Sequence, residues 1–198
     1  WSQRIDDRLN PQWRLVGEDQ RAPQIGFNLK ALISAAAVAF VEWSGGRGPT
    51  QLAQARGRAE EHRWYQRVSA GATYTSAHKL TLTLEYSRNG AAPGAQEWRA
   101  LQNGPALDYA RYRRWVYTAQ ELTTRGLVAL YASWPDALVR HLDFSAMARI
   151  NIDDGSRLHW FEARYHWNPF DLALQWQGAS GGARSDLGAP AQSRIWQV

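Results

Sequence analysis

Residues 67–86 read RVSAGATYTSAHKLTLTLEY, and this stretch decides the fold. Its first half alternates small apolar residues with polar ones up to Tyr74, and its second half alternates leucine with threonine up to Tyr86. Alternation with a period of two predicts β-strands, because successive side chains of a strand point to opposite faces of its sheet. Since residues 76–78 separate the two runs, the stretch predicts a β-hairpin with one apolar and one polar face.

The same pattern recurs along the chain. Short turns are expected at residues 34–36, 76–78, 135–137 and 168–170. The paired runs are residues 24–33 with 37–44, 64–75 with 79–88, 126–134 with 138–152, and 157–167 with 171–178. The ends of two more strands are expected at residues 1–5 and 194–198. The chain therefore predicts an all-β, antiparallel up-and-down sheet of about ten strands, in a single domain over residues 1–198.

The connections between these hairpins are longer. They span residues 6–23, 45–63, 89–125 and 179–193, with only residues 153–156 short. Short turns at one end and long connections at the other are typical of transmembrane β-barrels. A short helix is expected within residues 51–64, where only Gly57 interrupts a helical pattern.

The apolar face carries aromatic residues near both ends of the strands. Tyr and Trp favour membrane interfaces, because the ring is apolar while the N–H or O–H reaches water or headgroups. The predicted aromatic girdle consists of Trp43, Tyr74, Tyr86, Trp134, Tyr165, Trp167 and Trp176. The alternative is that these rings form the core of a soluble β-barrel or sandwich.

The opposite face is polar and charged, so it must meet water or pair with itself, because a buried unpaired charge is costly. The predicted pore-lining residues are Lys30, Glu42, Arg67, Lys79, Glu85, His141, Asp143, Arg149, Glu162, Arg164 and His166. In a narrow barrel these groups would fill the interior with ion pairs. In a wide barrel, or in one part of a larger barrel, they would line an aqueous path and set its selectivity.

The longest connection, residues 89–125, interleaves aromatic residues with arginines. Rings that cover apolar faces beside guanidinium groups suit sugars, anionic solutes or lipopolysaccharide. The predicted loop-binding residues are Trp98, Tyr109, Arg111, Tyr112, Arg113, Arg114 and Trp115. Two alternatives are that the loop folds inward and narrows the lumen, or that its aromatic residues pack on one another.

The charge favours anionic partners. All but Lys30 and Lys79 of the 23 basic residues are arginine, and the formal net charge is +5. Arginines in loops suit the phosphates of lipid headgroups, so lipid or an anionic solute is expected as partner and nucleic acid is not. The absence of cysteine from the sequence excludes disulfides and thiolate chemistry.

Other chemistry has weaker support. His141, Asp143 and Ser145 have the composition of a catalytic triad, but alternate residues of one strand stand about 7 Å apart, too far for a nucleophile and its base to hydrogen-bond. His159 faces away from Glu162 and His166 on an alternating strand, so no metal site is expected. Residues 153–156 fit a tight turn better than a calcium loop.

Over nearly its whole length, the pattern resembles a Gram-negative outer-membrane β-barrel of porin-like type. The resemblance implies an outer-membrane location, contact with outer-membrane lipid and lipopolysaccharide, residues missing at both ends of the chain, and no cofactor. It implies first a passive channel for small polar or anionic solutes. The alternatives are a non-conducting barrel that acts as a scaffold or partner subunit in an envelope complex, and an outer-membrane lipid hydrolase.

Overall fold

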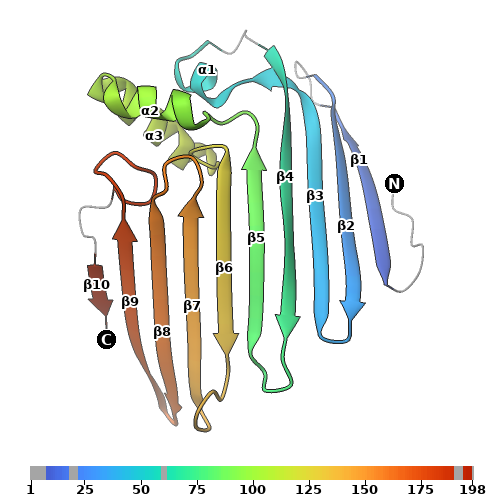
Figure 1. Ribbon diagram of the computed structural model, residues 1–198, viewed down its shortest axis with the longest axis vertical. Coiled ribbons are helices and arrows are strands. Elements are labelled where there is room, and N and C mark those ends of the chain that lie inside the picture. Colours follow the sequence, from blue (N-terminus) through green and yellow to red (C-terminus); the bar gives the residue numbers. More distant parts are fainter. Residues whose placement is uncertain (1–7, 18–21, 59–61, 190–193, 198) are drawn as a thin grey trace.

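The computed structural model describes residues 8–17, 22–58, 62–189 and 194–197. Ten β-strands form one sheet, and three helices lie at one end of it (Figure 1). The strands are β1 (Leu9–Val16), β2 (Gln24–Ser34), β3 (Ala37–Pro49), β4 (His62–Thr75), β5 (Thr81–Asn89), β6 (Gly126–Trp134), β7 (Leu142–Asn151), β8 (Arg157–Trp167), β9 (Phe170–Ser180) and β10 (Arg194–Gln197). The helices are α1 (Gln51–Ala55), α2 (Ala95–Asn103) and α3 (Ala106–Ala119).

Each strand pairs antiparallel with the next in the chain, so the spatial order follows the sequence order. The predicted up-and-down antiparallel sheet is confirmed. Within the described residues no pairing joins β1 to β10, so the sheet is open at these two edges.

The two ends of the sheet differ as predicted. Four short turns, β2–β3, β4–β5, β6–β7 and β8–β9, lie at one end, here called the short-turn end. The other connections, with all three helices, lie at the opposite end, here called the long-connection end (Figure 1).

Several predicted boundaries are wrong. Lys79 and His141 lie in turns rather than on strands, because their backbones have φ of 64° and 73°, a conformation that cannot continue a strand. Strand β1 occupies residues 9–16, which were expected in a long connection. Its Pro11 is tolerated because β1 is an edge strand. The expected strand end at residues 1–5 lies outside the described residues.

The predicted short helix is confirmed as α1, whereas α2 and α3 occupy a segment that was expected as an irregular loop. None of the three helices, which are all the helices of the described residues, has the length and hydropathy of a membrane-crossing helix.

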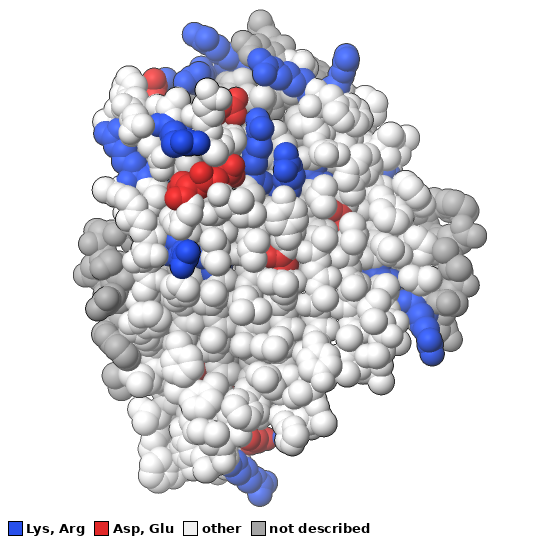
Figure 2. All heavy atoms as spheres, in the orientation of Figure 1, with Lys and Arg blue, Asp and Glu red and all other residues white. Residues whose placement is uncertain are grey.

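The register gives the sheet two unlike faces. In one continuous row across the strands, Val41, Ala70, Tyr86, Val128 and Ile150 are direct neighbours. This apolar face is uncovered, and its exposed large side chains include Leu15, Ile25, Val41, Tyr74, Leu84, Tyr86, Leu130, Phe161, Leu172 and Leu174. In Figure 2 the face in view is almost free of charge over the middle of the strands, while Lys and Arg gather at the long-connection end.

The buried core lies among the helices and not against the sheet. Trp98, Leu101, Tyr112 and Val116 are buried together, and side chains of α1 pack against them. The helices therefore form a small cap on the long-connection end and leave most of both sheet faces uncovered.

Candidate functional site

A cleft of about 560 Å³ lies over the polar face of the sheet at its long-connection end. Strands β1 to β5 and residues 120–122, which follow α3, line it together with one residue of β7. The ionisable residues of the polar face that line it are Arg14, Glu42, Arg67, Glu121 and Arg149, whereas Arg88 borders it from a strand position whose side chain points to the opposite face. This concentration of charge makes the cleft the candidate functional site.

Glu121 holds the segment after α3 against the polar face. Arg67 Nη2 donates to Glu121 Oε1 at 2.7 Å, and Asn89 Nδ2 donates to Oε2 at 2.9 Å. Arg67 and Asn89 are direct neighbours on β4 and β5. The carboxylate therefore bridges two strands, and the segment narrows the space over the polar face at this end.

A buried phenol supports the same segment from the cap. Tyr112 is 1% exposed, and its hydroxyl lies 2.7 Å from both Gln51 Oε1 and the Thr123 carbonyl. Burial, with the nearby carboxylate of Asp186, raises the pKa of Tyr112 well above its ordinary value. The hydroxyl thus stays protonated as a donor and ties α3 to α1 and to the segment.

A polar network attaches the β9–β10 connection to the cap. Asp186 accepts from Arg113 Nη1 at 2.8 Å and from Asn151 Nδ2 at 2.9 Å, while its backbone N–H donates to Asp154 at 2.8 Å. Although burial opposes it, hydrogen bonds from Ser156, Asp186 and Trp98 lower the pKa of Asp154. The Asp154 carboxylate therefore stays charged. It joins its own β7–β8 connection to Trp98 of the β5–β6 connection and to Asp186 of the β9–β10 connection.

Arg149 lines the cleft from β7 and also lines a second cleft of about 360 Å³ beneath α3. Like Lys30 and Glu42, it has no ion-pair partner within 4.0 Å among the described residues. Glu85 accepts hydrogen bonds from the Ser69 and Ser87 hydroxyls, each at 2.8 Å. Of the unpaired charges, Arg149 and Glu42 line the cleft, whereas Lys30 lies outside it.

Toward the short-turn end the charges pair with one another. Arg164 Nε donates to Glu162 Oε1 at 3.1 Å, and Gln175 donates to the same carboxylate. The imidazole of His166 lies 3.1 Å from Asp143 and 3.0 Å from Asp171. These contacts connect β7, β8 and β9 across the polar face.

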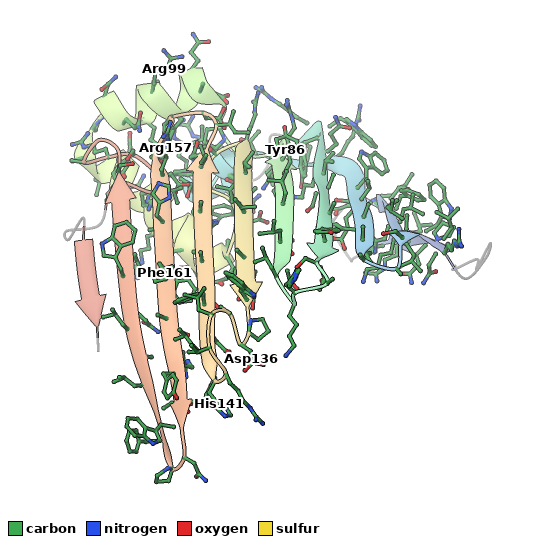
Figure 3. All side chains as sticks on the ribbon, turned by 60° about the horizontal axis from the view of Figure 1, so that its bottom comes forward. Tyr86, Arg99, Asp136, His141, Arg157 and Phe161 are labelled. Atoms are coloured by element: carbon green, nitrogen blue, oxygen red, sulfur yellow. The ribbon has the colours of Figure 1, made fainter. Side chains whose placement is uncertain are left out.

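A further ion pair joins the β4–β5 turn to the β6–β7 turn at this end. Lys79 Nζ lies 2.8 Å from Asp136 Oδ2, and the backbone N–H of His141 donates to Asp136 Oδ1 at 2.9 Å. The hydrogen bond from Lys79, then that from the His141 backbone, lowers the pKa of Asp136 to about 2. Figure 3 shows Asp136 and His141 in the β6–β7 turn, beside the ends of β8 and β9.

The predicted pore-lining residues thus divide into two sets. Lys30, Glu42, Arg67, Glu85, Asp143, Arg149, Glu162, Arg164 and His166 share the polar face. Lys79 and His141 lie in turns beyond it. A row of larger side chains, Tyr131, Met147 and Trp160, crosses the same face between Arg149 and Glu162.

The predicted loop-binding residues do not form one surface. Trp98 and Tyr112 are buried in the cap, and Tyr109 and Trp115 pack against them. Arg113 pairs with Asp186, whereas Arg111 and Arg114 are exposed. The aromatic residues of the β5–β6 connection thus pack on one another. Glu121, near the end of that connection, narrows the space over the polar face.

The predicted girdle residues all lie on the apolar face. Trp134, Tyr165, Trp167 and Tyr74 stand near the short-turn end, and Trp43 and Tyr86 stand toward the long-connection end. Trp176 pairs directly with Phe161 between them. The indole of Trp134 donates to the His78 carbonyl at 3.0 Å, and that of Trp43 donates to Gln66 at 3.2 Å.

Of the residues with the composition of a triad, Asp143 contacts His166 among the described residues: the imidazole of His166 lies 3.1 Å from Asp143 and 3.0 Å from Asp171. Within the part of the chain that the structure describes, no three or more histidine and carboxylate side chains gather to hold a metal ion.

Sequence reasoning missed Glu121 and the row of Tyr131, Met147 and Trp160. Glu121 follows a helix whose docking depends on tertiary contacts, and nothing in its neighbours marks it. The row places large, mostly apolar side chains on the polar face. Alternation of polar and apolar residues gives no reason to expect such side chains there. Met147 and Trp160 stand at positions where the alternation does predict this face, so their register is the available signal.

Comparisons with known proteins give no relative: no family model, no curated protein and no solved structure matches the chain. The interpretation of the cleft therefore depends on its own geometry.

Proposed function

We propose that the chain is part of an outer-membrane β-barrel whose polar face lines a passive path for small anionic solutes. The observation that carries this proposal is the uncovered apolar face of the sheet. Leu84, near the middle of β5, is 54% exposed, and Leu174, near the middle of β9, is 42% exposed. Exposed large apolar side chains occur on this face from β1 to β9, a wider surface than the patches of a few hundred Å² that soluble monomers expose.

A soluble sandwich would need a second layer over this face. The helices cap only the end of the sheet, and their side chains bury one another. Lipid supplies the missing cover, because a strand in a bilayer presents one face to hydrocarbon while its backbone hydrogen bonds are satisfied by neighbouring strands.

The height of the apolar band fits a bilayer. On β8, the positions of the apolar face run from Arg157 to Trp167, with Phe161 between them. Figure 3 labels Arg157 and Phe161 on this strand. The ten steps between the eleven residues of β8, at about 3.3 Å each, span about 33 Å of strand. With a strand tilt of about 40°, this corresponds to about 25 Å along the membrane normal, the usual height of a barrel's apolar band.

The open edges fit the proposal only if they are paired in the membrane. Unpaired strand edges are not tolerated in hydrocarbon, so β1 and β10 must pair with each other or with further strands. When these edges are paired, the polar face encloses the interior of a barrel.

The preference for anions is argued from unpaired charge. Arg14, Lys30 and Arg149 have no ion-pair partner among the described residues, and Arg14 and Arg149 line the cleft. Glu42 also lines the cleft without an ion-pair partner, whereas Glu85 lies outside it and accepts hydrogen bonds from two hydroxyls. Rings of charge set the selectivity of such pores, so the surplus of free cations favours anions.

The test is single-channel recording of the full-length protein in a planar bilayer under a salt gradient. Discrete conductance steps with a reversal potential toward anion preference support the proposal. Silence from protein that is folded, as judged by heat-modifiable electrophoretic mobility, overturns it.

A second function is favoured by one observation. The Glu121 segment and the ion pairs of β7 to β9 occupy part of the polar face, as expected for a non-conducting barrel that acts as a scaffold in an envelope complex. Silence in the same recording, together with correct folding, supports this alternative.

A further inference from the structure

Arginine is the only ionised residue type on the apolar face of the described strands, apart from β10, whose side chains are not described. Arg47, Arg88 and Arg157 stand there on β3, β5 and β8, all near the long-connection end. The aspartates and glutamates of strands β1 to β9 lie on the polar face instead. They are Glu42, Glu85, Asp143, Glu162 and Asp171.

The three arginines are free to take an external partner. All are exposed, and within the described residues none has a side-chain hydrogen bond or an ion pair. They are unlike Arg67 and Arg113, which are paired with carboxylates.

Two of them border the apolar band directly. Arg157 is the register neighbour of Ile150, and its row continues through Val128 to Tyr86. Arg88 follows Tyr86 by two residues and therefore points to the same face. Figure 3 shows Arg157 at the end of β8 nearest the helices, with Tyr86 toward the same end of β5.

We propose that Arg88 and Arg157, with Arg47 farther out, bind the phosphate groups of lipids in the leaflet at the long-connection end. This inference rests on the proposed function, because it needs the apolar face to lie in a bilayer. Arginine binds phosphate with a planar pair of donors, and the adjoining Ile150 and Val128 contact the acyl chains below. The short-turn end of the same face has aromatic residues instead, including Trp134 and Trp167, so the two leaflets meet different chemistry.

The test compares wild-type protein with R88Q/R157Q in dodecyl maltoside, titrated with lipid A and measured by native mass spectrometry. Each arginine near a phosphorylated surface contributes about fivefold, so the double variant is expected to bind roughly 30-fold more weakly. R88K/R157K keeps both charges and should retain most of the affinity. If the double variant does not fold, R88Q and R157Q are measured singly, each with about a fivefold loss expected.

Controls separate the site from general charge. R56Q/R99Q removes two exposed arginines from the cap, and Arg99 lies on α2 beyond the strands (Figure 3). The lipid A affinity of this variant should equal that of wild type. Dephosphorylated lipid A should bind wild type as weakly as lipid A binds R88Q/R157Q. Millimolar inorganic phosphate should not displace lipid A, because a free ion lacks the acyl chains.

Three results would overturn the inference: unchanged lipid A affinity in R88Q/R157Q, equal binding of dephosphorylated lipid A, or complete displacement by inorganic phosphate. Flotation of wild-type protein with phosphatidylglycerol vesicles distinguishes the two proposals. Flotation with unchanged lipid A affinity in the variant overturns only the phosphate site, whereas failure of wild type to float overturns the membrane proposal as well.

Discussion

Arg67 on β4 and Glu121, 54 residues later in the chain, form a 2.7 Å ion pair over the polar face of the sheet. The pair is partly exposed, with 43% and 22% of the two side chains accessible. It connects a strand to the segment that leaves α3, so it sets where the cap meets the cleft. Its position gives one carboxylate influence over both the width and the charge of the proposed path.

We expect E121Q to increase anion preference and to lower stability slightly. The substitution removes a negative charge and leaves the Arg67 guanidinium unpaired in the cleft. Because the pair is partly exposed, its loss should cost only about 1 kcal/mol. The reversal potential under a salt gradient and the midpoint of thermal unfolding measure the two effects.

The matched control is D108N. Asp108 is on α3, 3.9 Å from Arg111, and is away from the residues that line the cleft. It carries the same charge change, so its reversal potential should equal that of wild type. An E121Q reversal potential equal to that of D108N would contradict the predicted role of Glu121.

Arg149 is predicted to favour anions directly. It is unpaired within the described part of the chain and lines both clefts beside residues 120–122. R149Q should therefore shift the reversal potential toward cations while discrete conductance steps persist. R99Q, on the far side of the cap, provides the control, and an equal shift in both variants would indicate a general surface-charge effect.

Much of the fold follows from alternation alone. The bounds of β6 and β8 coincide with the predicted runs, because these strands have uninterrupted period-two patterns between clear turns. Strand β1 was missed because Pro11 interrupts its pattern. The turn before β7 was predicted too short because Leu138 and Val139 fit a strand pattern, and the sequence gives no sign of the positive φ of His141.

The site is harder to predict than the sheet. Alternation places Arg67 and Arg149 on the polar face, but it cannot show that one is paired and the other free. That difference depends on Glu121, which reaches the sheet only through the docking of α3. Likewise, Trp98 and Tyr112 suggest a binding surface in the sequence, but their packing buries them.

The hydroxyl of Tyr112 is predicted to make the cap sensitive to alkaline pH. Its pKa is raised by burial, while the unfolded chain ionises near the ordinary value of about 10. Stability from the neutral phenol is therefore fully present below about pH 10 and is lost as the pH rises above it. Thermal unfolding followed by circular dichroism from pH 8 to about 11 measures the decline.

Y112F removes this ionisation and also leaves buried acceptors without a donor. At neutral pH it should be less stable by about 1–3 kcal/mol, and its stability should fall less steeply above about pH 10 than that of wild type. Tyr117 on the same helix is 80% exposed, so Y117F is the control. An alkaline decline that is the same in Y112F and Y117F would contradict the prediction.

The turn at Asp136 is predicted to respond to acid. Because the pKa of Asp136 is lowered to about 2, its contribution to stability is present above the unfolded value of about 4 and is lost as pH falls through about 2. D136N should remove this acid dependence and leave Lys79 unpaired. D108N changes a carboxylate of similar exposure, 39% against 42%, and equal effects of the two variants on acid unfolding would contradict the prediction.

Among the glycines of the described strands, Gly71 is predicted to be the least replaceable. A Cβ there would lie 2.5 Å from the Leu84 carbonyl oxygen and 2.7 Å from the Phe40 ring, so even alanine must displace a neighbour. We expect G71A to destabilise the folded protein by about 1–3 kcal/mol, measured as the midpoint of urea unfolding in detergent. A Cβ added at Gly182 would have no atom within 4 Å, so G182A should leave the stability nearly unchanged. F40A/G71A removes the ring but not the carbonyl, and it should therefore remain less stable than F40A alone. Equal stability of F40A/G71A and F40A would show that the ring is the only obstacle and that the strand backbone yields freely.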